Sequence, residues 1–254
     1  MKRELSRRTL LASAGLALLG TGGGALAIAS TQPGTATSKW MVRWGLAVDL
    51  QKCRSLEGCR ACIDECHHRH RVGPHADPRH EIAWIGQAPF ERTFPETSHP
   101  WMDPSERERA VVVLCNHCAS PPCARVCPTG ATWRREDGVV AMDPHRCIGC
   151  RYCMAACPYG ARSFNWEAPS PTHPGEPYPT REVGIVEKCT LCADRIDVGG
   201  VPWCVEACQS RGGAALLFGD LHDPDSEIRR ALATRNVLRR RPSLGTDPSL
   251  YYLV

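Results

Sequence analysis

Four stretches of the chain show the apolar pattern of β-strands. In the first, residues 41–50, the side chains of Val42, Trp44, Leu46 and Val48 stand at every second position, and such alternation indicates a strand with one buried face. Three shorter apolar stretches follow at residues 110–114, 139–142 and 183–186. Because a group of cysteines comes after each of the four stretches, the pattern predicts four repeats of strand, cysteine loop and short helix.

The sixteen cysteines divide evenly among these repeats. Group I is Cys53, Cys59, Cys62 and Cys66; group II is Cys115, Cys118, Cys123 and Cys127; group III is Cys147, Cys150, Cys153 and Cys157; group IV is Cys189, Cys192, Cys204 and Cys208. In every group three residues separate the last two cysteines, and positions i and i+4 lie on one face of a helix. The repeat is therefore of the duplicated-half kind rather than a solenoid.

Two other segments have their own patterns. Residues 167–182 are polar and rich in proline, which excludes regular helix and central strand. We expect a surface loop joining groups III and IV, either a plain connector or a segment that lies against a partner. Residues 226–241 have Ile228, Leu232 and Leu238 as apolar positions and predict a helix, whose arginines we expect to form a solvated face rather than a docking surface.

The first 29 residues have the pattern of an export signal. Residues 1–9 are polar and basic, residues 10–29 are apolar and rich in Gly, Ala and Leu, and residues 25–29 offer small-residue cleavage sites. Arg7 and Arg8 stand before the apolar run, which resembles a twin-arginine signal. An uncleaved anchor or an ordinary secretory signal is the alternative. We expect a periplasmic protein that associates with the membrane through partners or an uncleaved N-terminus, since no other stretch is apolar enough to span a bilayer.

Composition sharpens this interpretation. Sixteen cysteines among 254 residues would ordinarily predict disulfides in an exported protein. The twin-arginine route carries proteins that have already folded with their cofactors, so metal clusters can form first in the reducing cytoplasm. Of the formal net charge of +4, the first 29 residues carry +3, and the nearly neutral remainder gives no argument for binding nucleic acid.

The spacing within the groups favours iron–sulfur clusters. Group III has the form Cys-x2-Cys-x2-Cys-x3-Cys-Pro, the bacterial ferredoxin run in which the fourth cysteine ligates the other cluster of a pair. Group II has a longer middle gap but also ends in Cys-Pro, group I is Cys-x5-Cys-x2-Cys-x3-Cys, and group IV is Cys-x2-Cys-x11-Cys-x3-Cys. A zinc- or disulfide-stabilised binding protein is the less favoured alternative, because zinc ribbons rarely add Cys-x3-Cys-Pro and cysteines on one helical turn suit disulfides poorly.

Groups I to IV in this order resemble the four-cluster ferredoxin subunits of membrane oxidoreductases, the family of the polysulfide, dimethyl sulfoxide and nitrate reductase iron–sulfur subunits. The resemblance covers residues 40–222. Within this family the chain is similar to the DsrO-type subunits of the DsrMKJOP complexes of dissimilatory sulfur metabolism, in the runs Cys62–His67, Leu114–Cys123 and His145–Trp166 and in the tail Leu244–Leu253. The long first gap of group I departs from the family pattern, which usually has Cys-x2-Cys there.

The resemblance implies an α+β fold of two pseudo-symmetric, bacterial-ferredoxin-like modules, one inserted in the other, with long loops. It also implies four [4Fe–4S] clusters with crossed ligation. The ligand sets are Cys53, Cys59, Cys62 with Cys208; Cys189, Cys192, Cys204 with Cys66; Cys115, Cys118, Cys123 with Cys157; and Cys147, Cys150, Cys153 with Cys127. The expected domains are a signal segment (1–29), a module with groups I and IV (40–109 and 183–222), a module with groups II and III (110–166), and a C-terminal helix and tail (223–254).

The same resemblance implies an electron carrier without a catalytic site of its own. It would relay electrons between an integral membrane quinone-reactive subunit and a multihaem cytochrome c, next to the other subunits of a complex for dissimilatory sulfite reduction or sulfur oxidation. The iron–sulfur subunit of a molybdopterin reductase or a hydrogenase is the alternative within the same class.

Histidines near the cysteine groups are further candidates. His67, His68 and His70 follow group I, and we expect exposed loop residues there rather than haem or zinc ligands. His117 and His145 stand next to predicted cluster ligands and are expected to tune hydrogen bonding to sulfur. The seven tryptophans are expected in the core or as shields of the clusters.

Overall fold

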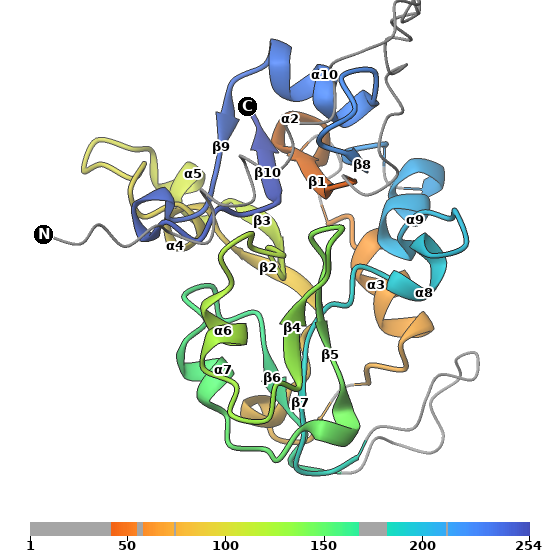
Figure 1. Ribbon diagram of the computed structural model, residues 1–254. Coiled ribbons are helices and arrows are strands. Elements are labelled where there is room, and N and C mark those ends of the chain that lie inside the picture. Colours follow the sequence, from red (N-terminus) through yellow and green to blue (C-terminus); the bar gives the residue numbers. More distant parts are fainter. Residues whose placement is uncertain (1–41, 55–57, 74, 168–181, 212) are drawn as a thin grey trace, which may run out of the picture. The chain divides into compact units, whose positions relative to one another are not determined.

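The computed structural model describes residues 42–54, 58–73, 75–167, 182–211 and 213–254. The predicted export signal and nearly all of the proline-rich segment lie outside these residues. Lys39–Val254 form one compact unit, to which the coloured elements of Figure 1 belong.

The largest sheet of this unit has four strands in the order β8-β1-β10-β9 (Figure 1). Strand β1 (Trp44–Asp49) is antiparallel to β8 (Leu216–Asp220) and parallel to β10 (Leu250–Leu253), which is antiparallel to β9 (Val237–Leu238). Five of the six residues of β1 are buried, as expected for a strand with neighbours on both edges and covered faces. The strand predicted before group I is therefore confirmed, but the expectation of a single buried face is wrong, since Ala47 and Asp49 are buried on the other face.

Three pairs of antiparallel strands accompany this sheet among the described residues. The pairs are β2 (Ile85–Pro89) with β3 (Ala110–Leu114), β4 (Thr132–Arg134) with β5 (Val140–Met142), and β6 (Ser163–Phe164) with β7 (Val186–Glu187). The strands predicted before groups II and III are confirmed. The strand before group IV is shorter than predicted and begins only at its last apolar residue, Val186.

Short helices carry the third cysteine of every group, as predicted. The helices are α2 (Leu50–Arg54), α3 (Ala61–Arg69), α4 (Phe90–Thr93), α5 (Pro104–Glu108), α6 (Pro122–Arg125), α7 (Tyr152–Ala155), α8 (Ala193–Ile196), α9 (Trp203–Arg211) and α10 (Glu227–Thr234), with 3-10 turns at Pro78–His80, Pro144–Arg146 and Pro242–Leu244. Only α3 and α9, with nine residues each, also include the fourth cysteine of their groups. In groups II and III the fourth cysteine follows the end of the helix, so the expectation that the last two cysteines share a helix is wrong for these two groups.

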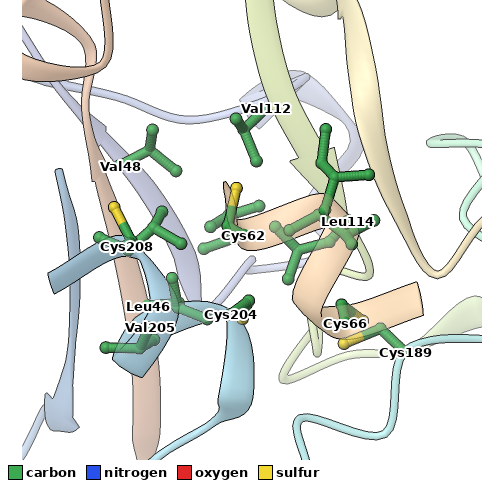
Figure 2. Close-up of a cluster of buried hydrophobic side chains, with 14 of the residues drawn as sticks. Leu46, Val48, Cys62, Cys66, Val112, Leu114, Cys189, Cys204, Val205 and Cys208 are labelled. Atoms are coloured by element: carbon green, nitrogen blue, oxygen red, sulfur yellow. The ribbon is translucent and has the colours of Figure 1, made fainter. Parts of the chain in front are cut away.

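The main hydrophobic core includes cysteines of groups I and IV. Figure 2 shows Cys62 and Cys66 on α3, Cys204 and Cys208 on α9, and Cys189 beside Cys66, in the same core as side chains of β1 and β3. A smaller core contains Cys123 and Cys153 together with Val140 and Val186. In one part of the fold, cysteines that the sequence predicts as ligands are thus also core residues.

The C-terminal helix is shorter than predicted. Helix α10 begins with Ser226 Oγ accepting a hydrogen bond from the Arg229 N–H at 3.3 Å, and it ends at Thr234. Beyond it, Arg235 forms an ion pair with Asp49 at 2.5 Å, and Arg240 is buried. The prediction of a helix to residue 241 with a solvated arginine face is therefore wrong for this second half.

Helices and strands both build the unit, so the predicted α+β class is confirmed. Within the ranges that the structure describes, no helix has the length and apolar character that crossing a lipid bilayer requires. The expectation for the tryptophans is wrong in part, because Trp84 is buried whereas Trp101, Trp133 and Trp166 are exposed.

Candidate metal centres

One backbone feature recurs in all four cysteine groups. The residue immediately before the second cysteine has a positive φ in each: Gly58 at 74°, His117 at 41°, Gly149 at 68° and Leu191 at 58°. Non-glycine residues rarely adopt this conformation. In group IV the turn lets the Leu191 N–H donate a hydrogen bond to Cys189 Sγ at 3.3 Å. Group I, despite its long first gap, thus keeps the turn of the other groups.

Helices α3 and α9 bring thiols of groups I and IV together. Burial and the neighbouring thiols of Cys208, Cys53 and Cys59 raise the pKa of Cys62 to about 12. Group I therefore meets a cysteine that lies some 150 residues later, because α3 packs against α9.

The last cysteine of group I has different neighbours. Burial and the thiols of Cys204, Cys189 and Cys192 raise the pKa of Cys66 well above its ordinary value. Figure 2 shows Cys66 and Cys189 side by side at the end of α3. One turn of helix separates Cys62 from Cys66, and different thiols act most strongly on the two, although Cys62 also contributes to raising the pKa of Cys66 and of Cys204.

Groups II and III meet through α6 and α7, which lie side by side in Figure 1. Burial and the thiols of Cys115, Cys123 and Cys157 raise the pKa of Cys118 to about 12, against a hydrogen bond from Thr246 that lowers it. Burial also raises the pKa of Cys153, against Arg162, which lowers it; the thiols of Cys123 and Cys147 add to the rise.

The remaining thiols of this region lie nearer the surface. Cys127 Sγ is 3.7 Å from Thr129 Oγ1, and Cys127, Cys147, Cys150 and Cys157 are only half-buried. All sixteen cysteines are free of disulfides, and the described residues contain no cluster of Cys, His, Asp or Glu close enough to hold a single metal ion.

His70 is a site residue that the sequence analysis placed wrongly. Instead of lying in an exposed loop, it is buried at the end of α3. Its Nδ1 lies 2.9 Å from the Cys66 carbonyl oxygen and 3.6 Å from Cys66 Sγ, and its Nε2 lies 3.9 Å from Cys192 Sγ. His67 and His68 also belong to the helix; His68 is exposed, and His67 Nε2 is 3.1 Å from the Ile85 carbonyl oxygen. The i+4 spacing from Cys66 to His70 was the signal for this contact.

The two histidines proposed to tune sulfur differ. His145 is exposed. His117 is buried and accepts a hydrogen bond from the Val140 N–H on Nδ1 at 3.0 Å, which leaves the other ring nitrogen as the donor of the neutral side chain. Burial opposes ionisation of Cys115, but the Lys188 ammonium and His117 outweigh it and hold the pKa of this thiol well below its ordinary range.

Buried polar atoms without a partner surround group II. Among the described residues, His117 Nε2, both side-chain polar atoms of Asn116, and one terminal nitrogen of Arg162 make no hydrogen bond of normal geometry. A buried donor without an acceptor is costly. An iron–sulfur cluster would supply thiolates and sulfides that accept hydrogen bonds, so the surroundings of group II fit such a cluster, held by cysteines and able to take up and release one electron.

Comparison with known proteins agrees with this chemistry. Residues 110–172 and 146–212 each match a family model described as a 4Fe-4S dicluster domain. The chain is similar to the Hdr-like menaquinol oxidoreductase iron-sulfur subunit 1 of Archaeoglobus fulgidus, with 39% identity over 83% of this chain and 82% of the relative.

Two further relatives have comparable coverage. The iron-sulfur subunit of the putative dimethyl sulfoxide reductase of Halobacterium salinarum is 36% identical over 84% of this chain and 79% of its own length. A subunit of the sulfite dehydrogenase of Allochromatium vinosum is 36% identical over 84% of this chain and 83% of its own length.

The cysteine turns and the dicluster matches define a ferredoxin-type iron–sulfur protein that carries electrons. With these relatives, the chain belongs to the family of 4Fe-4S iron–sulfur subunits of oxidoreductases.

Proposed function

We propose that the chain holds four [4Fe–4S] clusters with crossed ligation, in two ferredoxin-like modules of which one is inserted in the other. The observation that carries the proposal lies on α3, where the thiol that acts most strongly on Cys62 is Cys208 and the one that acts most strongly on Cys66 is Cys204. Cys118 and its neighbour Cys157 follow the same rule in the other module. The proposed ligand sets are Cys53, Cys59, Cys62, Cys208; Cys66, Cys189, Cys192, Cys204; Cys115, Cys118, Cys123, Cys157; and Cys127, Cys147, Cys150, Cys153.

The chain's own residues would set how readily each cluster accepts an electron, and they would break or form no bond in a substrate. Burial, hydrogen bonds to sulfur and nearby charge control such potentials. His70 beside Cys66 and Cys192, and the Leu191 N–H on Cys189, are contacts of this kind. The subunit would thus relay single electrons without a catalytic site.

We place this subunit in a DsrO-type complex of dissimilatory sulfur metabolism, at the periplasmic side of the membrane. The names of two relatives, a menaquinol oxidoreductase subunit and a sulfite dehydrogenase subunit, support quinone and sulfur chemistry. The partners would be an integral membrane quinone-reactive subunit and a multihaem cytochrome c. Residues 1–29, with Arg7 and Arg8, would direct export of the folded chain.

Metal analysis of protein purified without oxygen tests the clusters. We expect about 16 irons and as many acid-labile sulfides per chain, with the visible absorption of iron–sulfur clusters. About 8 irons would leave two clusters and contradict the four-cluster assignment. Stoichiometric zinc without iron would contradict the function itself.

Purification of the native complex through an affinity tag at the C-terminus tests the partners. Co-purification of a multihaem cytochrome c and a quinone-reactive membrane subunit supports the DsrO-type assignment. Co-purification of a large molybdopterin subunit supports the second candidate, which the relative named as a dimethyl sulfoxide reductase subunit favours.

The location is tested by replacing both signal arginines, as Arg7→Lys with Arg8→Lys. We expect the doubly substituted chain to accumulate in the cytoplasm with its iron, since the twin-arginine route requires the arginine pair. Unchanged recovery from the periplasmic side would contradict the proposed route.

A further inference from the structure

Two buried cations lie at the boundaries between cysteine groups, and each faces group II. We propose that Lys188 and Arg162 together stabilise the reduced state of the cluster at Cys115, Cys118 and Cys123, while each also acts on one further cluster: Lys188 on the cluster at Cys189, and Arg162 on the cluster at Cys153. The inference rests on the proposed function, because it concerns the potentials of the clusters.

Lys188 connects groups II and IV. Its side chain is 3% exposed, and its ammonium donates hydrogen bonds to the carbonyl oxygens of Val140 and, at 2.7 Å, of Cys189. The Val140 N–H in turn donates to His117, two residues after Cys115. A continuous polar path therefore runs from the loop of group II through β5 to the loop of group IV.

Packing agrees with this placement. Cys189 is buried in the main core, and Cys115 packs against the same core. Val140, whose carbonyl oxygen accepts from Lys188, packs with Cys123 of group II. The Lys188 ammonium therefore binds backbone next to cysteines of both groups.

Arg162 connects groups II and III. It is 6% exposed, and one terminal nitrogen donates to Thr132 Oγ1 at 3.2 Å. The other terminal nitrogen is buried and has no acceptor of normal geometry in the described part of the chain. The same nitrogen that donates to Thr132 lies 3.9 Å from Met142 Sδ. Met142 packs against the small core that contains Cys123 of group II and Cys153 of group III, so this guanidinium lies next to the core that both groups share.

A fixed positive charge raises the reduction potential of a nearby cluster, because reduction adds a negative charge. The effect is large where water is excluded. The nearest carboxylate in sequence, Glu187, accepts hydrogen bonds from Trp84 at 2.9 Å and from Asn165. Arg240, also buried, adds positive charge on the Cys157 side. The surroundings of the group II cluster are thus strongly cationic.

The test compares Lys188→Met and Arg162→Met with Lys52→Met in the anaerobically purified, cluster-containing chain. Lys52 is a matched control, since it also precedes the first cysteine of its group, but its side chain is exposed. Iron content and circular dichroism first establish that each variant is folded and holds all clusters. EPR-monitored redox titration at one fixed pH then gives the potential of every cluster.

We expect each of the two buried-site variants to lower the potentials of two clusters, with one cluster common to both. The expected shift is at least tenfold in the one-electron reduction equilibrium constant, which corresponds to 59 mV. In the double variant, the reduction equilibrium constant of the common cluster changes by about the product of the fold-changes seen in the two single variants, if the two charges act independently. For Lys52→Met, the one-electron reduction equilibrium constant of every cluster stays within threefold of the parent value, because solvent screens the charge of Lys52.

The proposal is overturned if the potentials shift by less than this amount or by no more than in Lys52→Met. It is also overturned if the two variants shift two pairs of clusters that have no member in common. Should a methionine variant lose iron, Lys188→Gln and Arg162→Gln keep a hydrogen-bond donor but remove the charge, and the same criteria apply to them. Iron at the full parental level with unshifted potentials refutes this proposal alone. A parental chain without iron refutes the proposed function.

Discussion

Helices α3 and α9 hold two cysteines each inside the main hydrophobic core. The four-residue helices α6 and α7 hold only one buried cysteine each, in a smaller core, and the fourth cysteines of their groups lie half-buried beyond the helix ends. In the first region the proposed ligands pack among side chains of β1 and β3. The positive-φ turn before the second cysteine is common to both regions. In the second region, prolines and buried polar contacts, rather than the main core, hold the short helices. The difference teaches that one ligand motif can be positioned by packing or by backbone geometry, with different vulnerabilities.

The largest effect is expected from Cys66→Ser. Cys66 is 5% exposed in the main core, so the variant loses a ligand and buries a hydroxyl. We expect about four fewer irons per chain and a free energy of unfolding lower by about 5 kcal/mol. Iron analysis and urea unfolding under argon measure both quantities. Cys150→Ser, at a half-buried position, should lose as much iron but less than half as much stability; equal losses would remove the contrast between the regions.

Gly149→Ala tests the backbone-held region. A Cβ at this residue would stand 2.1 Å from the Gly184 carbonyl oxygen, and φ is +68°. We expect the free energy of unfolding to fall by about 4 kcal/mol, because neither backbone segment can move away easily. We also expect the variant to lose the iron of the group III cluster. Gly160→Ala is the matched control, with φ of +62° and no atom within 4 Å, and should cost about 1–2 kcal/mol. If both variants cost the same, the close approach to Gly184 has no role.

Ile63→Ala tests the packing-held region without touching a ligand. Ile63 is 1% exposed on α3, and truncation of such a residue costs about 3 kcal/mol. Ile148→Ala changes the same side chain at a position in group III that is 67% exposed. Its free energy of unfolding should stay within about 0.5 kcal/mol of the parent value. Denaturant unfolding at pH 7 compares the two, and a large effect at Ile148 would show that the group III loop is more tightly packed than its exposure indicates.

The smallest effect is expected from Glu65→Gln. The carboxylate joins α3 to α9 through Arg211 at 2.6 Å and also binds Arg69 at 2.8 Å. The hydrogen bond from Arg69 is the main cause that lowers the pKa of Glu65, with a further contribution from Arg211 and against burial. We expect a loss of about 1 kcal/mol for a half-exposed pair.

The sign of its pH dependence follows from the lowered pKa. The stabilisation by Glu65 is present above the ordinary carboxyl pKa of 4.5 and is lost as the pH falls through the lower value of the folded state. The difference between parent and variant should therefore be constant from pH 8 to about pH 5 and shrink below that. A difference that grows in acid would contradict the ion-pair role.

Local features of the fold were predictable from the sequence. The alternation around Leu46 and Val48 located β1, and the cysteine spacing located the helix at the third cysteine of each group. These features depend on residues close together in the chain. The end of α10 was misjudged, because Arg235 leaves the helix to pair with Asp49, which lies almost 190 residues earlier.

The surroundings of the clusters were harder to predict. Helical spacing placed Cys62 and Cys66 on one helix, but no local pattern shows that Lys188 is buried while Lys52 is exposed. Both lysines precede a cysteine. Their different burial arises from β5, whose Val140 carbonyl approaches Lys188 from another part of the chain.

The parallel pairing of β1 with β10 has a consequence for synthesis. Leu46 lies opposite Leu250 in this pair, so the first strand to leave the ribosome waits for a partner made about 200 residues later. At about 5–20 residues per second, this delay is on the order of 10–40 s. During that time the thiols of α3 stand without the sheet that covers them. A chaperone that shields nascent chains, or one that delivers clusters late, would therefore find its substrate in this unfinished sheet.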